Sequence, residues 1–187
     1  MNRGKLIVIS APSGSGKTTI AKEIMKRNPT LVFSVSATTR AKRDGEVEGR
    51  DYFYLTEDEF LKKIDEGEFI EWEKLYGNYY GTLKQEVERT ICNGKHMLFD
   101  VDVNGGLSIK RKYPDACLIF IKPPSIEALK QRLFGRRTEN GTATTRRLDR
   151  VPMELEKGQE FEHQIVNDAL DIAVEEVQNI VQTHLHE

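Results

Sequence analysis

The chain has 187 residues, of which 31% are charged and 38% hydrophobic, and its formal net charge is −2. This length suits one compact domain with small inserts, and the near-balanced charge argues against a large basic surface that would bind nucleic acid. No apolar run approaches the roughly 18 residues that a membrane span requires. The chain enters its first strand directly, so we expect no signal peptide and no membrane partner.

The two cysteines, Cys92 and Cys117, both lie in apolar patterns and have no neighbours at metal-ligand spacing. This arrangement predicts two reduced thiols in the core, which is typical of a cytoplasmic protein.

The first predicted unit is a strand, a glycine-rich turn and a helix. An apolar run at residues 6–9 precedes the sequence APSGSGKT at residues 11–18. Glycines let backbone N–H groups wrap around an anion, and the helix start adds its dipole. Lys17 supplies a positive charge for the outer phosphates, and Thr18 a hydroxyl for Mg²⁺. The usual motif has glycine where this chain has Ala11, which fits if its φ is negative; a Gly/Ser-rich surface turn is the alternative.

The next stretch predicts a second strand at residues 31–36, then a basic loop and a change of pattern. The expected elements are strands at 51–55 and 69–73, a helix at 57–66 with a capping box at Thr56, and a turn at 78–82. We interpret residues 37–82 as a small mixed insert with its own strands, which leans on the main sheet.

Strands and helices alternate in the rest of the chain. The predicted strands are 96–102, 116–121 and 164–167, and the predicted helices are 83–92, 107–112, 126–134, 145–161 and 169–185. The last helix is expected to direct Ile172, Ala173, Val177, Ile180 and Val181 inward, and the polar segment 135–142 to be mobile. Together, these strands and helices predict an α/β fold in which helices cover both faces of a five-stranded parallel sheet.

Ligands of such sheets bind at the carboxyl ends of the strands. Asp100 follows the apolar residues 97–99 of a predicted strand. An acidic side chain close to the phosphate loop is suited to ordering Mg²⁺. The alternative is a carboxylate that caps the next helix, and the phosphate loop favours the metal role.

Arginines gather in two clusters, one after the second strand and one near the segment 135–142. The first holds Arg40 and Arg43, and the second Arg132, Arg136, Arg137, Arg146 and Arg147. Phosphoryl transfer needs fixed cations around the moving group. Any single arginine is more simply read as solvated surface, but the two clusters beside glycines favour phosphate binding.

Glu71, between Ile70 and Trp72, is either an exposed strand carboxylate or a group that reads a base. Guanine presents N1–H and N2–H₂ as donors, which a carboxylate matches, and hydroxyls such as those of Ser36 and Thr82 match its acceptors. Tyr52 and Tyr80 are either phenols that hold a phosphate or core aromatics.

These stretches, in their order and spacing, resemble the guanylate kinase family over nearly the whole chain. The matching motifs are SAPSGSGKT at 10–18, FSVSATTR at 33–40, GEVEGRDY at 45–52, FIEW at 69–72, GNYYGT at 77–82, DVD at 100–102, PPS at 123–125, RLFGRR at 132–137 and IVND at 165–168.

The resemblance implies a P-loop NTPase three-layer fold and an enzyme that transfers the γ-phosphate of ATP to GMP or dGMP, with Mg²⁺, in purine nucleotide metabolism. Its implied parts are an ATP-binding core (1–36, 83–125 and 151–187), a GMP-binding domain (37–82) and a helical lid (126–150). ATP and GMP are the implied partners, and a homo-oligomer stays open.

The family pattern also implies a role for each matching residue. The ATP-binding set is Ala11, Pro12, Ser13, Gly14, Ser15, Gly16, Lys17, Thr18, Thr19, Arg132 and Asn167. The GMP-binding set is Ser36, Arg40, Arg43, Tyr52, Glu71, Tyr80, Thr82 and Asp102. The catalytic set is Lys17, Arg40, Arg136 and Arg147, and the Mg²⁺ set is Thr18 and Asp100. Thr82 stands where the family often has serine, and whether Arg146 or Arg147 reaches the phosphates stays open.

Two other functions are alternatives to this one. Peptide-binding scaffold domains share the fold without catalysis, but the intact Gly16, Lys17 and Thr18 argue against that class. A kinase for another nucleoside monophosphate or a phosphorylated sugar is disfavoured by the set Ser36, Glu71 and Thr82.

Overall fold

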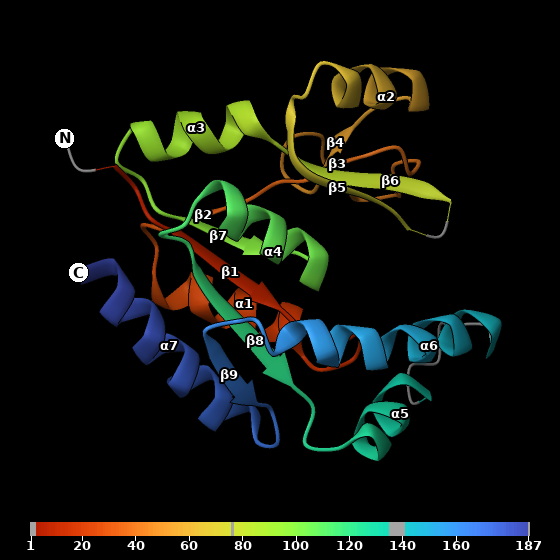
Figure 1. Ribbon diagram of the computed structural model, residues 1–187, viewed down its shortest axis with the longest axis vertical. Coiled ribbons are helices and arrows are strands. Elements are labelled where there is room, and N and C mark those ends of the chain that lie inside the picture. The colour runs from red at the N-terminus through yellow and green to blue at the C-terminus, as the bar shows by residue number, and fades with distance from the viewer. Residues whose placement is uncertain (1–2, 76, 135–140, 187) are drawn as a thin grey trace.

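The computed structural model describes residues 3–75, 77–134 and 141–186, the last range without the side chains of residues 141–144 and 146. Five parallel strands form its main sheet, in the order β2-β7-β1-β8-β9 (Figure 1). They are β1 (Leu6–Ser10), β2 (Val32–Phe33), β7 (Met97–Asp100), β8 (Cys117–Lys122) and β9 (His163–Val166). The predicted α/β fold with a five-stranded parallel sheet is confirmed.

Helices cover both faces of the main sheet, which explains why its central strands β7, β1 and β8 are mostly apolar and buried. Ile7 and Ile9 of β1 pack toward α1 (Lys17–Arg27) and α7 (Leu170–His186). Leu6 and Val8, which alternate with them, pack toward α3 (Lys84–Cys92) and α4 (Val103–Lys112). The alternation therefore builds two separate cores, one on each side of the sheet.

Two details of this packing differ from expectation. Ile172 is 58% exposed rather than inward, because the buried stripe of α7 runs through Ala173, Val174, Val177 and Val181. Cys92 is exposed at the end of α3, so only Cys117 is the buried thiol that the apolar pattern predicted.

A second sheet of four strands lies above the carboxyl ends of β7 and β1, in the order β4-β3-β6-β5 (Figure 1). Its elements are β3 (Ala37–Thr38), β4 (Phe53–Tyr54), β5 (Phe69–Leu75), β6 (Asn78–Leu83) and α2 (Glu57–Asp65). Thr56 and Glu59 form the predicted capping box of α2. Phe60 stacks on Phe69 with ring centroids 4.3 Å apart, which gives this small sheet a core of its own.

The turn expected at residues 78–82 is wrong, because these residues form strand β6. The turn precedes them at Gly77, whose φ of 88° is left-handed, and β6 then pairs antiparallel with β5 from Asn78 to Leu83. Gly81 lets the two strands approach, since a Cβ there would lie 2.8 Å from the Glu71 carbonyl oxygen.

The strand expected at residues 31–36 is also shorter than predicted. Only Val32 and Phe33 pair with β7, and the chain then crosses to the small sheet, where Ala37 and Thr38 pair with β6 and β4. The apolar run was therefore a link between two sheets rather than one strand.

Two helices, α5 (Ile126–Phe134) and α6 (Gly141–Gly158), pack against each other through Leu129, Leu133 and Val151. α6 begins at Gly141, so residues 141 and 142 of the expected mobile segment are helical, and residues 135–140 lie outside the described residues. Pro152 lies inside α6. Among the described residues, no helix is long and apolar enough to span a membrane.

Candidate active site

The phosphate-loop motif lies between the carboxyl end of β1 and the start of α1, as its sequence predicted. Gly16 precedes α1 and has a left-handed φ of 93°. A Cβ at this position would lie 2.3 Å from the side-chain nitrogen Nδ2 of Asn167. This position therefore accepts only glycine. The loop lines a cavity of about 280 Å³, so its backbone is open to an anionic ligand.

The side chain of Lys17 crosses to the end of β7. Its ammonium lies 2.6 Å from Asp100 Oδ1 and donates to the Val101 carbonyl oxygen at 2.9 Å. Thr18 donates from its hydroxyl to Asp100 Oδ2 at 3.2 Å. The structure therefore brings together a cation, a hydroxyl and a carboxylate, because β7 and β1 are neighbouring parallel strands.

Asn167 and Arg132 support the loop from the other side. The buried Asn167 side chain donates to the Ser15 carbonyl oxygen at 2.8 Å. Arg132 of α5 donates to the Asn167 carbonyl oxygen at 3.1 Å. These bonds tie α5 and the end of β9 to the phosphate loop.

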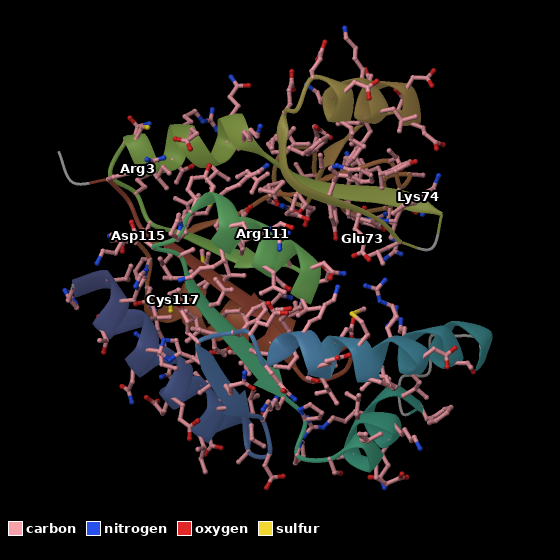
Figure 2. The ribbon with its side chains drawn as sticks, viewed as in Figure 1. Arg3, Glu73, Lys74, Arg111, Asp115 and Cys117 are labelled. Carbon is pink, nitrogen blue, oxygen red and sulfur yellow. The ribbon has the colours of Figure 1, made fainter. Side chains whose placement is uncertain are left out.

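A further cavity, of about 450 Å³, opens between the phosphate loop and the small sheet. The two cavities adjoin, because four residues line both: Lys17, Leu75, Asp102 and Arg147. Glu73 of β5 lines this cavity and lies well apart from Cys117 (Figure 2).

Glu71 lines this larger cavity, with Ser36 and Asp102 also in its wall. The buried Thr82 is the partner of Glu71 across β5 and β6. The Thr82 hydroxyl donates to the Glu71 carboxylate at 2.6 Å. Burial raises the pKa of Glu71 to about 7 against the lowering effect of this hydrogen bond, and the nearby Asp102 charge adds to the rise. Asp102 caps α4 through the Gly105 amide at 2.8 Å, so the capping role weighed for Asp100 belongs to Asp102.

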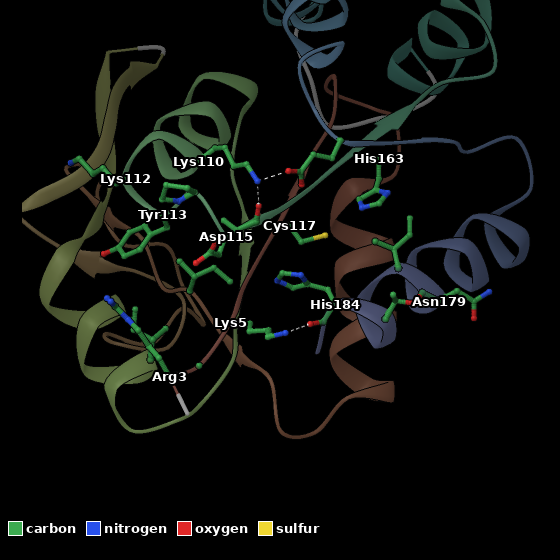
Figure 3. A pocket seen from close by; sticks show the side chains of 18 residues that line it. Arg3, Lys5, Lys110, Lys112, Tyr113, Asp115, Cys117, His163, Asn179 and His184 are labelled. Carbon is green, nitrogen blue, oxygen red and sulfur yellow. Dashed lines mark hydrogen bonds and ion pairs between the residues drawn. The ribbon is translucent and has the colours of Figure 1, made fainter. Parts of the chain in front are cut away.

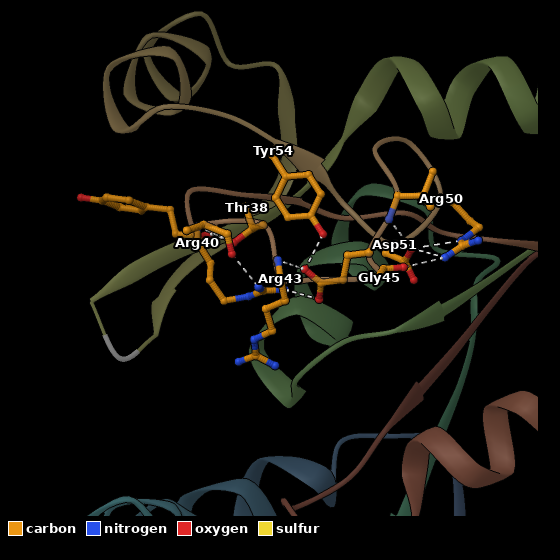
Figure 4. Close-up of polar contacts among 11 residues, drawn as sticks. Thr38, Arg40, Arg43, Gly45, Arg50, Asp51 and Tyr54 are labelled. Carbon is orange, nitrogen blue, oxygen red and sulfur yellow. Dashed lines mark hydrogen bonds and ion pairs between the residues drawn. The ribbon is translucent and has the colours of Figure 1, made fainter.

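Arg40 is held by Glu46, a residue that the sequence analysis did not single out (Figure 4). Its guanidinium lies 2.7 Å from the Glu46 carboxylate, which also accepts from the Arg43 amide at 2.8 Å and the Tyr54 hydroxyl at 2.7 Å. The hydrogen bond from Arg40 is the largest cause that lowers the pKa of Glu46 to about 2 and raises the pKa of Arg40.

The aromatic residues of the predicted set gather beside Arg40. The Arg40 guanidinium lies 5.2 Å from the Tyr52 ring centroid, in cation–π range, and Tyr52 packs edge-on against Tyr80 at 6.2 Å. The Arg43 side chain points away from this group of contacts (Figure 4). Tyr52 and Tyr80 both line the larger cavity, so they are accessible phenols rather than core aromatics.

Arg150 is a second residue that sequence reasoning missed. Its guanidinium lies 3.0 Å from Glu73 and 3.1 Å from Asp102, and its Nε lies 3.6 Å from Glu154. Burial raises the pKa of Glu73 to about 7. In the sequence, only the i, i+4 spacing of Arg150 and Glu154 on a predicted helix indicates an ion pair at Arg150. Glu73 and Asp102 are distant in the sequence, so no local pattern links them to Arg150.

The structure describes only some of the arginines predicted for the lid. Arg147 of α6 lies 3.4 Å from the Ser13 hydroxyl and lines both cavities. Arg136 lies outside the described residues, as does the Arg146 side chain.

Comparisons with known proteins agree on one family. The guanylate kinase family model matches residues 3–184. The chain is similar to guanylate kinases of Thermotoga maritima (46% identity, over 97% of this chain and 87% of that one) and Chlorobaculum tepidum (49%, over 95% and 91%). The crystal structure of guanylate kinase from Anaplasma phagocytophilum aligns with a TM-score of 0.79 at 29% identity and covers 100% of this chain and 89% of that one.

Proposed function

The chain belongs to the guanylate kinase family and is an ATP:GMP phosphotransferase, and from this premise we propose which of its residues carry the reaction. In this proposal ATP lies on the phosphate loop, on residues 11–19 with Arg132 and Asn167 in support, and GMP lies against the small sheet. The two substrates meet at Lys17 and Arg147. The supporting observation is that these two cations line both cavities.

We propose that Glu71 and Thr82, with Ser36 and Asp102, recognise the guanine base. A carboxylate matches the N1–H and N2–H₂ donors of guanine, and hydroxyls match its acceptors. Adenine lacks this donor pair and would leave a desolvated carboxylate unpaired, which is strongly unfavourable. These contacts involve only the base, so dGMP is expected to be accepted as well.

In the same proposal the GMP phosphate is held by Arg40, Arg43, Tyr52 and Tyr80. Glu46 fixes the Arg40 guanidinium beside Tyr52, so the cation is already oriented when the substrate enters. Arg43 is the more adaptable of the two arginines, since its guanidinium points away from these contacts (Figure 4).

Catalysis in this scheme consists of positioning and charge neutralisation. The acceptor is an anionic phosphate oxygen, so no protein nucleophile is needed. Lys17 and Arg147, with Arg40 and Arg136, surround the moving phosphoryl group with positive charge. Closure of residues 126–150 over the cleft is proposed to exclude water, which would otherwise hydrolyse ATP.

The family's nucleotide kinases generally use Mg–ATP, and the residues present fit a magnesium ion. Thr18 and Asp100 offer a hydroxyl and a carboxylate, the hard oxygen ligands that Mg²⁺ prefers. The ion neutralises phosphate charge when bound. Asp100 now pairs with Lys17 and Thr18, and we propose that these two side chains hold its carboxylate in place.

The experiment that tests this assignment is an ADP-release assay across the nucleoside monophosphates. We expect turnover with GMP and dGMP and almost none with AMP, CMP or UMP. Comparable rates with AMP would remove Glu71 and Thr82 from base recognition. A cytoplasmic location and the absence of nucleic-acid and membrane partners stay predictions, and a homo-oligomer stays open.

A further inference from the structure

A separate cavity, of about 880 Å³, lies at the amino ends of the main-sheet strands (Figure 3). Cys117 begins β8 and His163 begins β9. The candidate active site is at the other edge of the sheet, after Ser10 and Asp100. A six-residue strand such as β8 spans about 17 Å at 3.3 Å per residue, so this cavity is remote from the kinase chemistry.

Three side chains of different chemistry converge at this cavity. The Cys117 sulfur, a Glu162 carboxylate oxygen and a His163 ring nitrogen all lie within 4.8 Å of one another. The fold explains the convergence. His163 pairs with Ile119 across β8 and β9, so its side chain and that of Cys117, two residues earlier, share one face of the sheet.

Glu162 reaches the same place from just outside β9. One carboxylate oxygen accepts from the Leu118 amide at 3.2 Å, and the other pairs with the Lys110 ammonium. Each carboxylate oxygen has a further lone pair to offer. No hydrogen bond from the described residues engages the His163 ring, so its ring nitrogens are available as ligands.

Sulfur, imidazole nitrogen and carboxylate oxygen together are the donor set of a borderline-soft divalent cation. Zn²⁺ binds all three, at about 2.0–2.3 Å, whereas Mg²⁺ and Ca²⁺ prefer oxygen alone. Tetrahedral ligands at those bond lengths lie roughly 3.3–3.8 Å apart, so the three side chains need to close by about 1 Å. Rotamer changes at a cavity wall readily supply such a movement.

We propose that Cys117, Glu162 and His163 form a binding site for a zinc-type divalent cation, with water from the cavity as the fourth ligand. The ion ties the start of β8 to the start of β9, and thus to the segment that follows α6. Because the three ligands come together only in the folded chain, binding raises the free energy of unfolding.

Lys110 gives this proposal a distinctive signature. Its ammonium pairs with Glu162 and donates to the Ala116 carbonyl oxygen at 2.8 Å. A cation at the site competes with that ammonium for the carboxylate and is repelled by its charge. Removing the charge with Lys110→Gln is therefore expected to tighten metal binding severalfold.

The test uses untagged protein in a phosphine reductant, titrated with Co²⁺ as a spectroscopic probe and then with Zn²⁺. We expect a near-ultraviolet sulfur-to-cobalt band at one ion per chain, displaced by Zn²⁺. Cys117→Ser should abolish the band, and Cys92→Ser, at the exposed second cysteine, should keep it. A missing band in the parent protein, or one that follows Cys92, overturns the proposal.

A second pair of variants protects the test against a folding defect at the buried Cys117. His163→Asn, at a half-buried position, should weaken Zn²⁺ affinity about tenfold or more, while Lys110→Gln should strengthen it. The thermal shift produced by Zn²⁺ should follow the same order. Kinase activity without added Zn²⁺ should be unchanged in both, which shows that they are folded. An unchanged affinity in His163→Asn contradicts the site.

Discussion

The Thr82 hydroxyl donates to the Glu71 carboxylate at 2.6 Å, and the two residues are direct partners across β5 and β6. The antiparallel register thus fixes a carboxylate and a hydroxyl side by side, with the carboxylate in the wall of the larger cavity. The bulge between Phe69 and Glu71 is what brings Glu71 into register with Thr82.

Glu71→Gln is expected to raise KM for GMP about 100-fold or more, with little change in KM for ATP. The amide would present a donor where guanine also presents donors, so a favourable contact becomes an unfavourable one. Steady-state kinetics with each substrate varied in turn measures this split. Asp65→Asn, an exposed carboxylate at the end of α2, is the matched control. An equal rise in both KM values would argue for general damage instead.

The pH dependence of GMP binding should report the same carboxyl. Because the pKa of Glu71 is raised to about 7, the free enzyme holds a proton there below this pH, and the proposed contact with guanine would displace it. KM for GMP should therefore fall as the pH rises from about 6 to 8. In Glu71→Gln this part of the fall should be absent, and an identical pH profile in both proteins would contradict it.

Stability should respond to the same group with a defined sign. The folded-state pKa is raised from 4.5 to about 7, so between these values the folded chain binds more protons than the unfolded one. The contribution to stability is present below pH 4.5 and is lost as the pH rises through about 7. Melting temperatures across this window should therefore fall more steeply for the parent protein than for Glu71→Gln.

Lys17→Met should reduce kcat by about 10²–10³ or more, because a fixed cation is lost at the phosphates. The chain should stay folded, since Lys17 lies at the cavity rather than in either core. Lys26→Met is the control, at an exposed lysine of the same helix that pairs with Glu23. Circular dichroism and single-turnover rates measure the two effects, and a full rate in Lys17→Met would exclude its role.

Glu46→Ala should raise KM for GMP about tenfold. Arg40 would lose the carboxylate 2.7 Å away that holds its guanidinium and would become mobile before substrate binding. Asp44→Ala, exposed in the same loop, serves as the comparison. If the two variants behaved alike, the orientation of Arg40 by Glu46 would be of no consequence for binding.

Arg150 and Glu73 should be energetically coupled. Their contact joins α6 to β5. Removing Arg150 leaves the half-buried Glu73 carboxylate without this cation, whereas Arg150 without Glu73 keeps its contacts with Asp102 and Glu154. A double-mutant cycle with Arg150→Met and Glu73→Gln should give a coupling free energy of about 0.5–3 kcal/mol in urea unfolding. Strict additivity of the two single changes would show that the contact is not stabilising.

The sequence predicts best what is local in the chain. The phosphate loop is a run of eight residues whose spacing alone specifies a strand, an anion-binding turn and a helix. The capping box of α2 is equally local. The alternation of apolar strands and helices predicts the parallel sheet because each element must bury one face.

The sequence predicts poorly those features of the fold and the site that depend on partners distant in the chain. Strand β6 has the composition of a turn, and only its pairing with β5 makes it a strand. Asp100 and Asp102 look equivalent, but only Asp102 starts a helix and caps it. Arg150 joins three acids from three elements, and no pattern within one element reveals such a meeting.

The link between the two sheets also bears on how such a protein can change over time. The chain enters the small sheet at Ala37 and leaves it after β6, and Ala37 pairs with Gly81. Entry and exit are therefore neighbours, about 5 Å apart. A module attached through two adjacent ends can be lengthened, trimmed or exchanged while the strands beneath keep their positions. Under the proposed assignment, in which GMP lies against the small sheet, the acceptor preference of this enzyme can thus evolve separately from the residues that hold its phosphate donor.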